Sequence, residues 1–259
     1  MNRYAPLLLL LAACCSSTAV VAQDVPLTTD QVAAINQLAE QGDANAQFIL
    51  GNMYLKGEGV AKNDAEAVKW YRLAADQGNA DAQYNLGVAY HDGEGVAKNY
   101  AEAMKWYRLA AAQGDAPAQS NLGWMYANGE GVAKNNVEAV KWYRLAADQG
   151  DARAQTNLGN MYHDGEGVPK NNVEAVKWYR LAADQGNADA QHNLGLKYAK
   201  GEGVPKNDVE AYLWWNLAAA QGHADAKTNR DIVEKKMTRE QIAEAQRRSA
   251  AWKPKTIAP

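Results

Sequence analysis

The sequence has no cysteine after position 15. Its two cysteines, Cys14 and Cys15, lie in a short apolar segment near the N-terminus. If that segment is removed by cleavage after Ala22, the mature chain contains no thiol. A disulfide framework and a cysteine nucleophile are therefore excluded for the mature protein.

A basic region is also missing. The formal net charge is −3, from 27 Lys and Arg against 30 Asp and Glu, and the basic residues form no block. The electrostatic pattern of a nucleic-acid-binding protein is absent, so we expect no nucleic-acid partner. Phenylalanine occurs once, whereas there are eight tryptophans and thirteen tyrosines. This imbalance indicates that a repeating unit sets the aromatic positions.

The first 22 residues have the pattern of an export signal. Asn2 and Arg3 form a short positive leader, residues 7–15 form an apolar stretch, and residues 20–22 offer a cleavage site of small side chains. The apolar stretch is too short to span a bilayer. Residues 1–22 are therefore predicted to be a signal peptide.

A second interpretation of this segment involves a lipid anchor. Residues 11–14 resemble the lipobox of bacterial lipoproteins, in which the cysteine becomes the acylated first residue of the mature chain. The signal would then be residues 1–13, and Cys14 would be lipidated. The short distance from Arg3 to Cys14 favours simple cleavage after Ala22. We expect an exported periplasmic or secreted protein, with a membrane-anchored lipoprotein as the alternative.

The strongest feature of the sequence is an internal period of 36 residues. Gln-Gly pairs recur at this spacing and end at Gly42, Gly78, Gly114, Gly150, Gly186 and Gly222. Such self-similarity is typical of solenoids built from helical hairpins. The predicted units are 43–78, 79–114, 115–150, 151–186 and 187–222, preceded by an N-terminal helix in 23–42. A partial repeat and capping helix follow in 223–252, and the tail 253–259 is expected to fray.

Each unit predicts two helices joined by a G-E-G-V-x-K-N loop. The Asp or Asn after each Gln-Gly pair caps the first helix, for example 80–92. Asn99 closes the loop and stands three residues before Glu102, which is the spacing of a capping box. The loop resembles a phosphate-binding loop, but a helix precedes it, and Pro169 and Pro205 remove N–H groups from two copies. We interpret it as an inter-helix turn.

The positions that do not change between units predict the packing. Gln83, Leu86 and Tyr90 share one face of a first helix. Gly87 and its equivalents cost about 1 kcal/mol each relative to alanine in a helix, so they predict a close approach of the paired helix. In the second helices, alanines alternate with bulky pairs such as Trp142 and Tyr143, which predicts packing of large against small side chains.

These motifs carry a resemblance to a known family. The blocks A-x-A-Q-x-N-L-G-x-M-Y, G-x-G-V-x-x-N and A-x-x-W-Y-x-x-A-A-x-Q-G recur in order over residues 43–222. The chain resembles the Sel-one-like repeat family, which is related to the tetratricopeptide repeat. The resemblance implies an all-α, right-handed α-solenoid with a concave groove, and the role of a scaffold or adaptor for other proteins. Some cysteine-rich members are β-lactamase-like, but this chain lacks their paired cysteines.

The positions that change between units are the candidates for ligand binding. They fall at unit positions 3, 6, 10 and 13, which form one stripe of each first helix. A mixture of aromatic, amide and histidine side chains on this stripe is typical of a protein-binding surface. The candidate partner-binding residues are Phe48, Asn52, Tyr84, Val88, His91, Ser120, Trp124, Thr156, Asn160, His163, His192 and Leu196.

Chemistry beyond binding is not indicated. His91 and His163 are two units apart, about 20 Å at the usual spacing of packed helices, whereas a metal–nitrogen bond is about 2 Å. No serine has a plausible histidine and acid partner. We therefore expect no metal, no cofactor and no catalytic residue, and a monomer whose groove binds a protein or peptide. The alternatives are a binder of cell-wall glycan and, less favoured, a β-lactamase-like hydrolase.

Overall fold

The structure is a computed structural model that describes residues 27–255. The proposed signal segment, Cys14 and the last four residues of the tail lie outside the described residues. Within 27–255 the chain forms thirteen helices and no strand. The helices are α2 (Thr29–Glu40), α3 (Ala44–Lys56), α4 (Asp64–Asp76), α5 (Ala80–Asp92), α6 (Tyr100–Ala112), α7 (Ala116–Asn128), α8 (Asn136–Asp148), α9 (Ala152–Asp164), α10 (Asn172–Asp184), α11 (Ala188–Lys200), α12 (Asp208–Ala220), α13 (Ala224–Glu234) and α14 (Arg239–Ala251).

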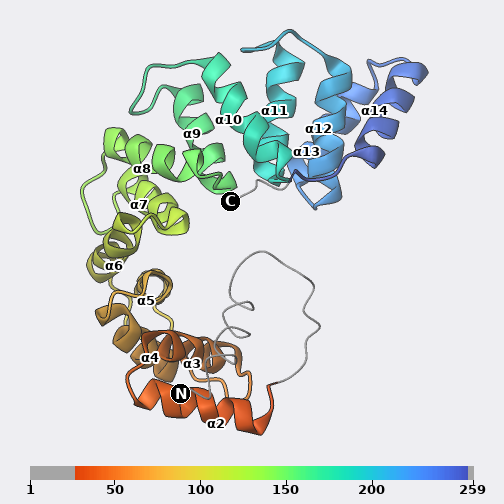
Figure 1. Cartoon of the computed structure of the whole chain (residues 1–259). Coiled ribbons are helices and arrows are strands. Elements are labelled where there is room, and N and C mark those ends of the chain that lie inside the picture. Colours follow the sequence, from red (N-terminus) through yellow and green to blue (C-terminus); the bar gives the residue numbers. More distant parts are fainter. Residues whose placement is uncertain (1–26, 256–259) are drawn as a thin grey trace.

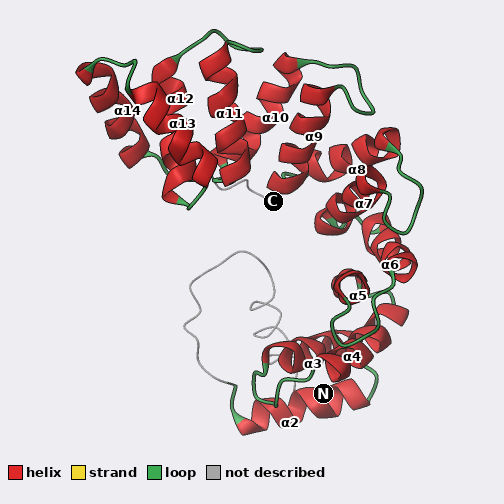
Figure 2. Cartoon of the chain, turned by 180° about the vertical axis from the view of Figure 1, so that it is seen from behind, coloured by secondary structure: helices red, strands yellow, loops and turns green. Residues whose placement is uncertain are grey.

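The helices form an all-α solenoid. Each helix packs against the next one along the chain, and the stack bends into an open arc that runs from α2 to α14 (Figure 1). In the middle of the arc, α5 and α7 lie on the inner side, and α6 and α8 lie on the outer side. The same arc is seen from behind in Figure 2, where helices and loops make up the described part. In this part of the arc the first helices therefore line the concave side, as expected for helices that carry the stripe of variable residues.

Asparagine caps start the second helices, but not as capping boxes. The Asn99 side chain accepts hydrogen bonds from the backbone N–H groups of Ala101 and Glu102. Its own N–H donates to the Tyr90 carbonyl at 2.8 Å. Because that N–H is already bonded to the first helix, Glu102 has no capping role and instead pairs with Lys105. The expectation of a reciprocal capping box in each unit is therefore wrong.

The helix glycines permit close packing against an aromatic ring. A Cβ atom added at Gly123 would lie 2.5 Å from the Tyr143 ring, and one added at Gly87 would lie 2.6 Å from the Tyr107 ring. Real side chains do not approach so closely, which explains why these helices tolerate glycine. In α4, α6, α8 and α10 the tyrosine of the bulky pair is the residue buried in this contact, and in α12 Trp215 takes its place, whereas Trp142 of α8 is only half-buried.

Glutamine pairs connect successive hairpins. The Gln83 Nε2 donates to the Ala75 carbonyl at 3.1 Å, and its Oε1 accepts from the Gln113 Nε2 at 2.8 Å. One buried amide thereby joins α5 to the preceding α4 and to the end of α6. Each full repeat contains an equivalent pair. Buried polar groups require such partners, so the constant glutamines are structural.

The C-terminal tail does not fray where the structure describes it. The Lys255 N–H donates to the Asp184 carbonyl at 2.8 Å, and Lys255 Nζ lies 2.7 Å from Asp184 Oδ2. Trp252 packs against the hydrophobic cluster of α10 to α12. The expectation that the tail frays from residue 253 is therefore wrong for residues 253–255, because they dock on α10.

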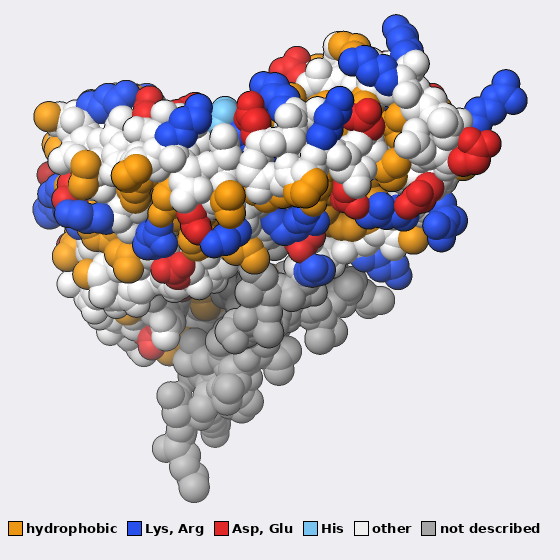
Figure 3. Space-filling view, turned by 90° about the horizontal axis from the view of Figure 1, so that it is seen from above, with side chains coloured by type: hydrophobic (Ala, Val, Ile, Leu, Met, Phe, Trp, Pro, Cys, Tyr) orange, Lys and Arg blue, Asp and Glu red, His pale blue; other side chains and the backbone are white. Residues whose placement is uncertain are grey.

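The outer surface mixes charged and apolar side chains. One exposed leucine of each of α4, α6, α8 and α10 contributes to it, as at Leu145, which is 50% exposed. Figure 3 shows apolar side chains scattered among lysine, arginine and carboxylate side chains, with no broad apolar sheet on that face. None of the helices in 27–255 has the length and apolar character needed to cross a bilayer.

Candidate functional site

In two of the repeats, an asparagine on the groove side of the first helix accepts a hydrogen bond from the buried tyrosine. In repeat 1 the Tyr71 hydroxyl donates to Asn52 Oδ1 at 2.7 Å, and Asn85 from the next repeat donates to the same oxygen at 3.3 Å. Repeat 4 has the same arrangement, with Tyr179 and Asn193 donating to Asn160 at 2.7 and 3.1 Å. We call repeats 1 and 4 the closed repeats. Their variable residues at position 10 satisfy the buried framework.

Repeats 2 and 3 lack this asparagine and are the open repeats. Val88 and Trp124 occupy its position. The hydroxyls of Tyr107 and Tyr143 consequently lack the asparagine acceptor to which the same hydroxyl donates in both closed repeats. A cavity of about 250 Å³ lies here between α5, α6, α7 and α9. Its lining residues are Tyr84, Val88, His91, Asp92, Tyr107, Asn121, Trp124, Met125 and Arg153.

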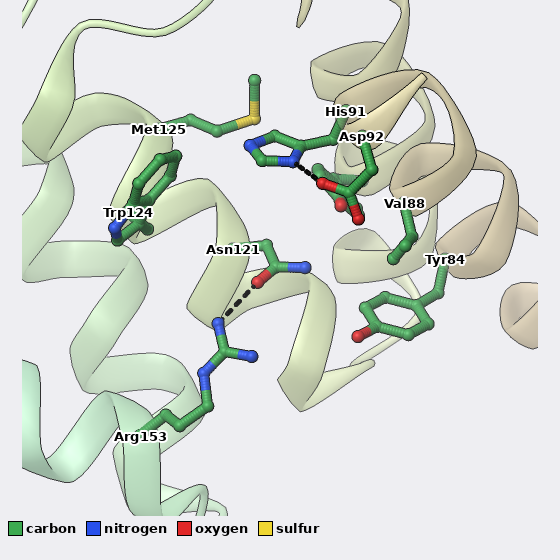
Figure 4. Close-up of a pocket in the computed structure, with 9 residues that line it drawn as sticks. Tyr84, Val88, His91, Asp92, Asn121, Trp124, Met125 and Arg153 are labelled. Atoms are coloured by element: carbon green, nitrogen blue, oxygen red, sulfur yellow. Dashed lines mark hydrogen bonds and ion pairs between the residues drawn. The ribbon is translucent and has the colours of Figure 1, made fainter. Parts of the chain in front are cut away.

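Aromatic side chains and one cation define the shape of the cavity. Figure 4 shows Trp124 and Tyr84 on opposite sides of it, with Asn121 between them. Arg153 Nη2 donates to Asn121 Oδ1 at 2.9 Å, and Figure 4 shows the amide nitrogen of Asn121 turned to the side of Tyr84. Arg153 is the only arginine in the first helices of the five repeats. No carboxylate of residues 27–255 lies within ion-pair distance of it.

The other end of the cavity is acidic. His91 Nδ1 lies 2.6 Å from Asp92 Oδ1, and His91 Nε2 lies 3.1 Å from Glu130 Oε2 in the following loop. The imidazole also meets the Trp124 ring edge-on, with 5.5 Å between ring centroids. Ionised carboxylates only accept hydrogen bonds, so both contacts are hydrogen bonds when the ring carries two protons. His91 of repeat 2 therefore contacts both Trp124 and Glu130 of repeat 3.

The phenols of the site stay protonated at neutral pH. Burial raises the pKa of Tyr107 well above the usual value, and burial also raises the pKa of Tyr84, partly offset by the positive charge of Arg153. Both hydroxyls can therefore donate hydrogen bonds to a ligand. Together with Arg153 and Asn121, the two hydroxyls give the part of the cavity away from Asp92 more hydrogen-bond donors than acceptors.

The size of the cavity limits what it can hold. Sites for cofactors and drug-sized ligands usually enclose about 300–1,000 Å³, and this cavity is smaller. One bulky side chain of a bound segment fits it better. Within 27–255 there is also no group of three His, Cys, Asp or Glu residues placed to hold a metal ion.

The structure brings together four of the twelve candidate residues. Tyr84, Val88, His91 and Trp124 line the cavity. Ser120 and Thr156, at 1% and 5% exposure, are buried between helices, so almost none of either side chain faces the groove surface. Their side chains are short, and the neighbouring repeat covers them. The other six candidates lie in other repeats as half-buried side chains: Phe48, Asn52, Asn160, His163, His192 and Leu196.

Sequence reasoning missed five lining residues as candidates: Asp92, Tyr107, Asn121, Met125 and Arg153. Asn121 and Tyr107 belong to positions that hardly vary between units, so they were attributed to the framework. Arg153 lies on the variable stripe, and its uniqueness among first helices was the available signal. The lack of an asparagine at position 10 also distinguishes repeats 2 and 3 from repeats 1 and 4. That difference has a meaning only once the contact of this asparagine with the buried tyrosine is known.

Comparison with known proteins identifies both the repeat and its fold. The family model described as Sel1 repeat matches residues 44–79, 80–115, 116–151, 152–187 and 188–223. The comparison with curated proteins finds no match. Among solved structures, a protective antigen of uropathogenic Escherichia coli with an SLR fold is 41% identical, with a TM-score of 0.81. The match covers 86% of this chain and 48% of the antigen, so the chain spans about half the length of that protein.

A second solved structure matches along almost its whole length. It is a Sel1 repeat protein from Oxalobacter formigenes, which is 35% identical with a TM-score of 0.76. That match covers 89% of this chain and 93% of the other. An immunity protein from Pseudomonas aeruginosa, Pa5087, is 23% identical with a TM-score of 0.50, over 87% of this chain and 84% of the other. At that identity the likeness shows the fold alone.

Proposed function

This chain is a member of the Sel1 repeat family, and from that premise we propose that it is an exported scaffold that binds an extended segment of a partner protein. Sel1 repeat proteins are in general non-enzymatic scaffolds for protein–protein contacts. The concave side of the open repeats is the proposed binding surface. Export is proposed from the sequence of residues 1–22, with cleavage after Ala22 favoured over lipidation of Cys14.

The observation that carries this proposal is the cavity of the open repeats. A chain that needed only a stable solenoid could repeat the asparagine of repeats 1 and 4, which satisfies the buried tyrosine. Val88 and Trp124 instead remove that asparagine acceptor from two tyrosines and leave a recess between aromatic rings. Buried aromatic anchors in pockets dominate the affinity of protein interfaces. We propose that one bulky apolar side chain of the partner fills this recess.

Charge defines a second part of the partner segment. Arg153 has no carboxylate partner in residues 27–255, and Asn121, which accepts its hydrogen bond through Oδ1, turns the amide nitrogen to the side of Tyr84. A guanidinium fork and an amide N–H together match the geometry of a carboxylate. The proposed segment therefore carries an acidic group next to its bulky side chain.

The test is a selection of displayed random peptides against the mature chain, residues 23–259, followed by titration calorimetry. Val88→Asn restores the residue type of the closed repeats, so we expect it to close the cavity and weaken selected peptides at least about tenfold. Arg153→Asp, which copies Asp81 and Asp189 of other repeats, should weaken mainly the acidic peptides. Leu145→Ala on the outer surface is the control. Equal affinity for the Val88→Asn variant and the control would refute the site.

A glycan ligand, the alternative left open by the sequence, is tested with the same variants. Sedimentation with purified peptidoglycan that is lost in Val88→Asn, without selection of any peptide motif, would replace the peptide by a glycan. For export, a reporter enzyme fused after residue 22 should reach the periplasm, and labelling with a radioactive fatty acid should be negative in the wild type and unchanged in Cys14→Ala. Labelling lost in Cys14→Ala would instead establish the lipoprotein.

A further inference from the structure

The joint between repeats 4 and 5 contains a buried lysine. Lys197 is 3% exposed, and its position holds methionine or alanine in the other four repeats. Its ammonium donates to Glu202 Oε2 at 2.8 Å, to Asn172 Oδ1 at 2.8 Å and to His163 Nδ1 at 2.7 Å. These three partners satisfy all three N–H groups of the lysine. The joint therefore shows what kind of group this position between repeats can enclose.

The joint between repeats 1 and 2 has the same geometry without the lysine. Ala89 takes the place of Lys197, Glu94 that of Glu202, Asp64 that of Asn172 and Leu55 that of His163. A recess of about 50 Å³ lies there, and these four residues are all in its lining. A space of that size is several times larger than a single water requires. The recess thus occupies the place that the lysine side chain fills three repeats later.

Of the four joints between full repeats, this is the one whose glutamate, Glu94, receives no hydrogen bond from the described residues. At the other three joints between full repeats, the corresponding glutamate pairs with a group supplied by the chain: His91 with Glu130 at 3.1 Å, Asn136 with Glu166 at 3.1 Å and Lys197 with Glu202 at 2.8 Å. Among the described residues nothing donates to Glu94. The reason is the residue at the start of α4, because Asp64 can only accept where Asn136 donates.

Asp64 adds a second carboxylate to the recess, paired only with Lys62 in a long ion pair. Its Oδ1 is buried and has no hydrogen-bond partner in the described chain. The nearest cation is Lys62, whose Nζ lies 3.6 Å away on an exposed side chain, beyond hydrogen-bond length. A buried carboxylate oxygen without a donor is unfavourable, and a bound cationic group would remove that cost.

From these four joints we infer that the recess between Asp64 and Glu94 binds a primary ammonium group of the partner segment. This inference rests on the proposed function, since Val88 lines both this recess and the cavity near Trp124. One extended segment can therefore contact both. The ammonium enters the place of the Lys197 Nζ and donates to Glu94, to Asp64 Oδ1 and to solvent. The groove then selects a segment with a cationic group at the side of repeat 1 and an acidic group at Arg153.

The test uses small probes that do not need the Trp124 cavity. The mature chain is titrated with Nα-acetyl-lysine methylamide, which keeps a free side-chain ammonium. Binding is monitored by the backbone amide NMR signals of residues 55, 64, 89 and 94. Acetyl-norleucine methylamide is the uncharged control of nearly the same shape, and alaninamide presents an ammonium at an N-terminus instead of a side chain. We expect the lysine probe to shift these signals and the norleucine probe to leave them unchanged. A response to alaninamide that exceeds the lysine response would assign the site to an N-terminal amine.

Two variants make the result decisive. Glu94→Gln, an exposed change that leaves the fold intact, should weaken the lysine probe at least about tenfold, because it removes a charge-assisted hydrogen bond. Ala89→Lys copies repeat 5 and should fill the recess with the chain's own ammonium, abolishing probe binding while the melting temperature stays level or rises. Absence of any lysine-specific shift, or full binding by both variants, would overturn the inference. Peptides that still depend on Val88 and Arg153 would then leave the proposed function standing.

Discussion

The closed repeats and the open repeats share one framework and are distinguished by the residue at position 10 of the first helix. In repeats 1 and 4 an asparagine accepts from the buried tyrosine, whereas in repeats 2 and 3 Val88 and Trp124 replace it. The glycine–tyrosine contact below is the same in all four. The residue at position 10 therefore varies without disturbing the contact that holds each hairpin together. The comparison separates the residues of that contact from the residues of the proposed binding surface.

The largest expected effect concerns the tyrosine that both kinds of repeat bury. Tyr143→Ala in an open repeat and Tyr179→Ala in a closed repeat should each lower the free energy of unfolding by about 3–5 kcal/mol, since each removes a fully buried ring. Urea unfolding of the mature chain measures both. Trp142→Ala, at a half-buried position, should cost less. A larger loss for Trp142→Ala would show that the framework contact has been assigned to the wrong aromatic residue.

The glycine opposite the tyrosine should give the next largest effect. Gly123→Ala gains about 1 kcal/mol in helix propensity, but its Cβ would lie 2.5 Å from the Tyr143 ring. Overpacking of this kind costs about 1–3 kcal/mol, so we expect net destabilisation of about 1 kcal/mol. The double variant with Tyr143→Leu should show less than the sum of the two losses, because the leucine makes room. A Gly123→Ala variant more stable than wild type would contradict the close contact.

A hydroxyl deletion distinguishes the closed from the open repeats directly. Tyr179→Phe removes the hydrogen bond to Asn160 and should cost about 0.5–1.5 kcal/mol. Tyr143→Phe removes a hydroxyl that has no partner in the described chain, so its effect on the free energy of unfolding should be close to zero. Thermal and urea unfolding of the two variants, side by side, provide the measurement. Equal losses would mean that the open repeats satisfy their tyrosines by another route.

The repeat architecture could be predicted because the chain contains five copies of the same unit, which can be compared with one another. The period, the asparagine caps and the tight glycine contact all follow from comparing units within one sequence, and α5 has the expected bounds. The capping boxes were wrong because the bond of the Asn99 N–H to the Tyr90 carbonyl depends on how the loop folds back. The docking of Lys255 on Asp184 likewise joins residues far apart in sequence.

The candidate site was only partly predictable for a related reason. Variability between units marks Val88 and Trp124, but it also marks Ser120 and Thr156, whose short side chains the next repeat covers. Thr156 Oγ1, for example, bonds to the Ala152 carbonyl and to Asn187 of the following repeat. Asn121 was overlooked because it is constant. Its place in the candidate site depends on its contact with Arg153, which only the packed structure shows.

Repeat 5 belongs to neither kind and gives the smallest expected effect, which is a dependence of stability on pH. Its first helix carries His192, which stacks on His223, the N-cap of α13, with 4.4 Å between ring centroids. Burial lowers the pKa of His192, and the second imidazole lowers it further, against the opposing charges of Asp225 and Asp189. In the unfolded chain the pKa returns to about 6.5. Below that value the unfolded state binds a proton that the folded state resists, so stability falls as the pH drops.

We therefore expect the melting temperature to decrease between pH 7.5 and pH 5.5, and His192→Gln to remove part of that decrease while leaving the value at pH 7.5 nearly unchanged. Thermal unfolding of the two proteins across this range is the measurement. The ring is about half-buried, so solvent screening keeps the effect modest compared with the aromatic and glycine variants. An unchanged pH profile in His192→Gln would show that the stacked pair does not oppose protonation. The difference in stability between acid and neutral pH would then arise elsewhere in the solenoid.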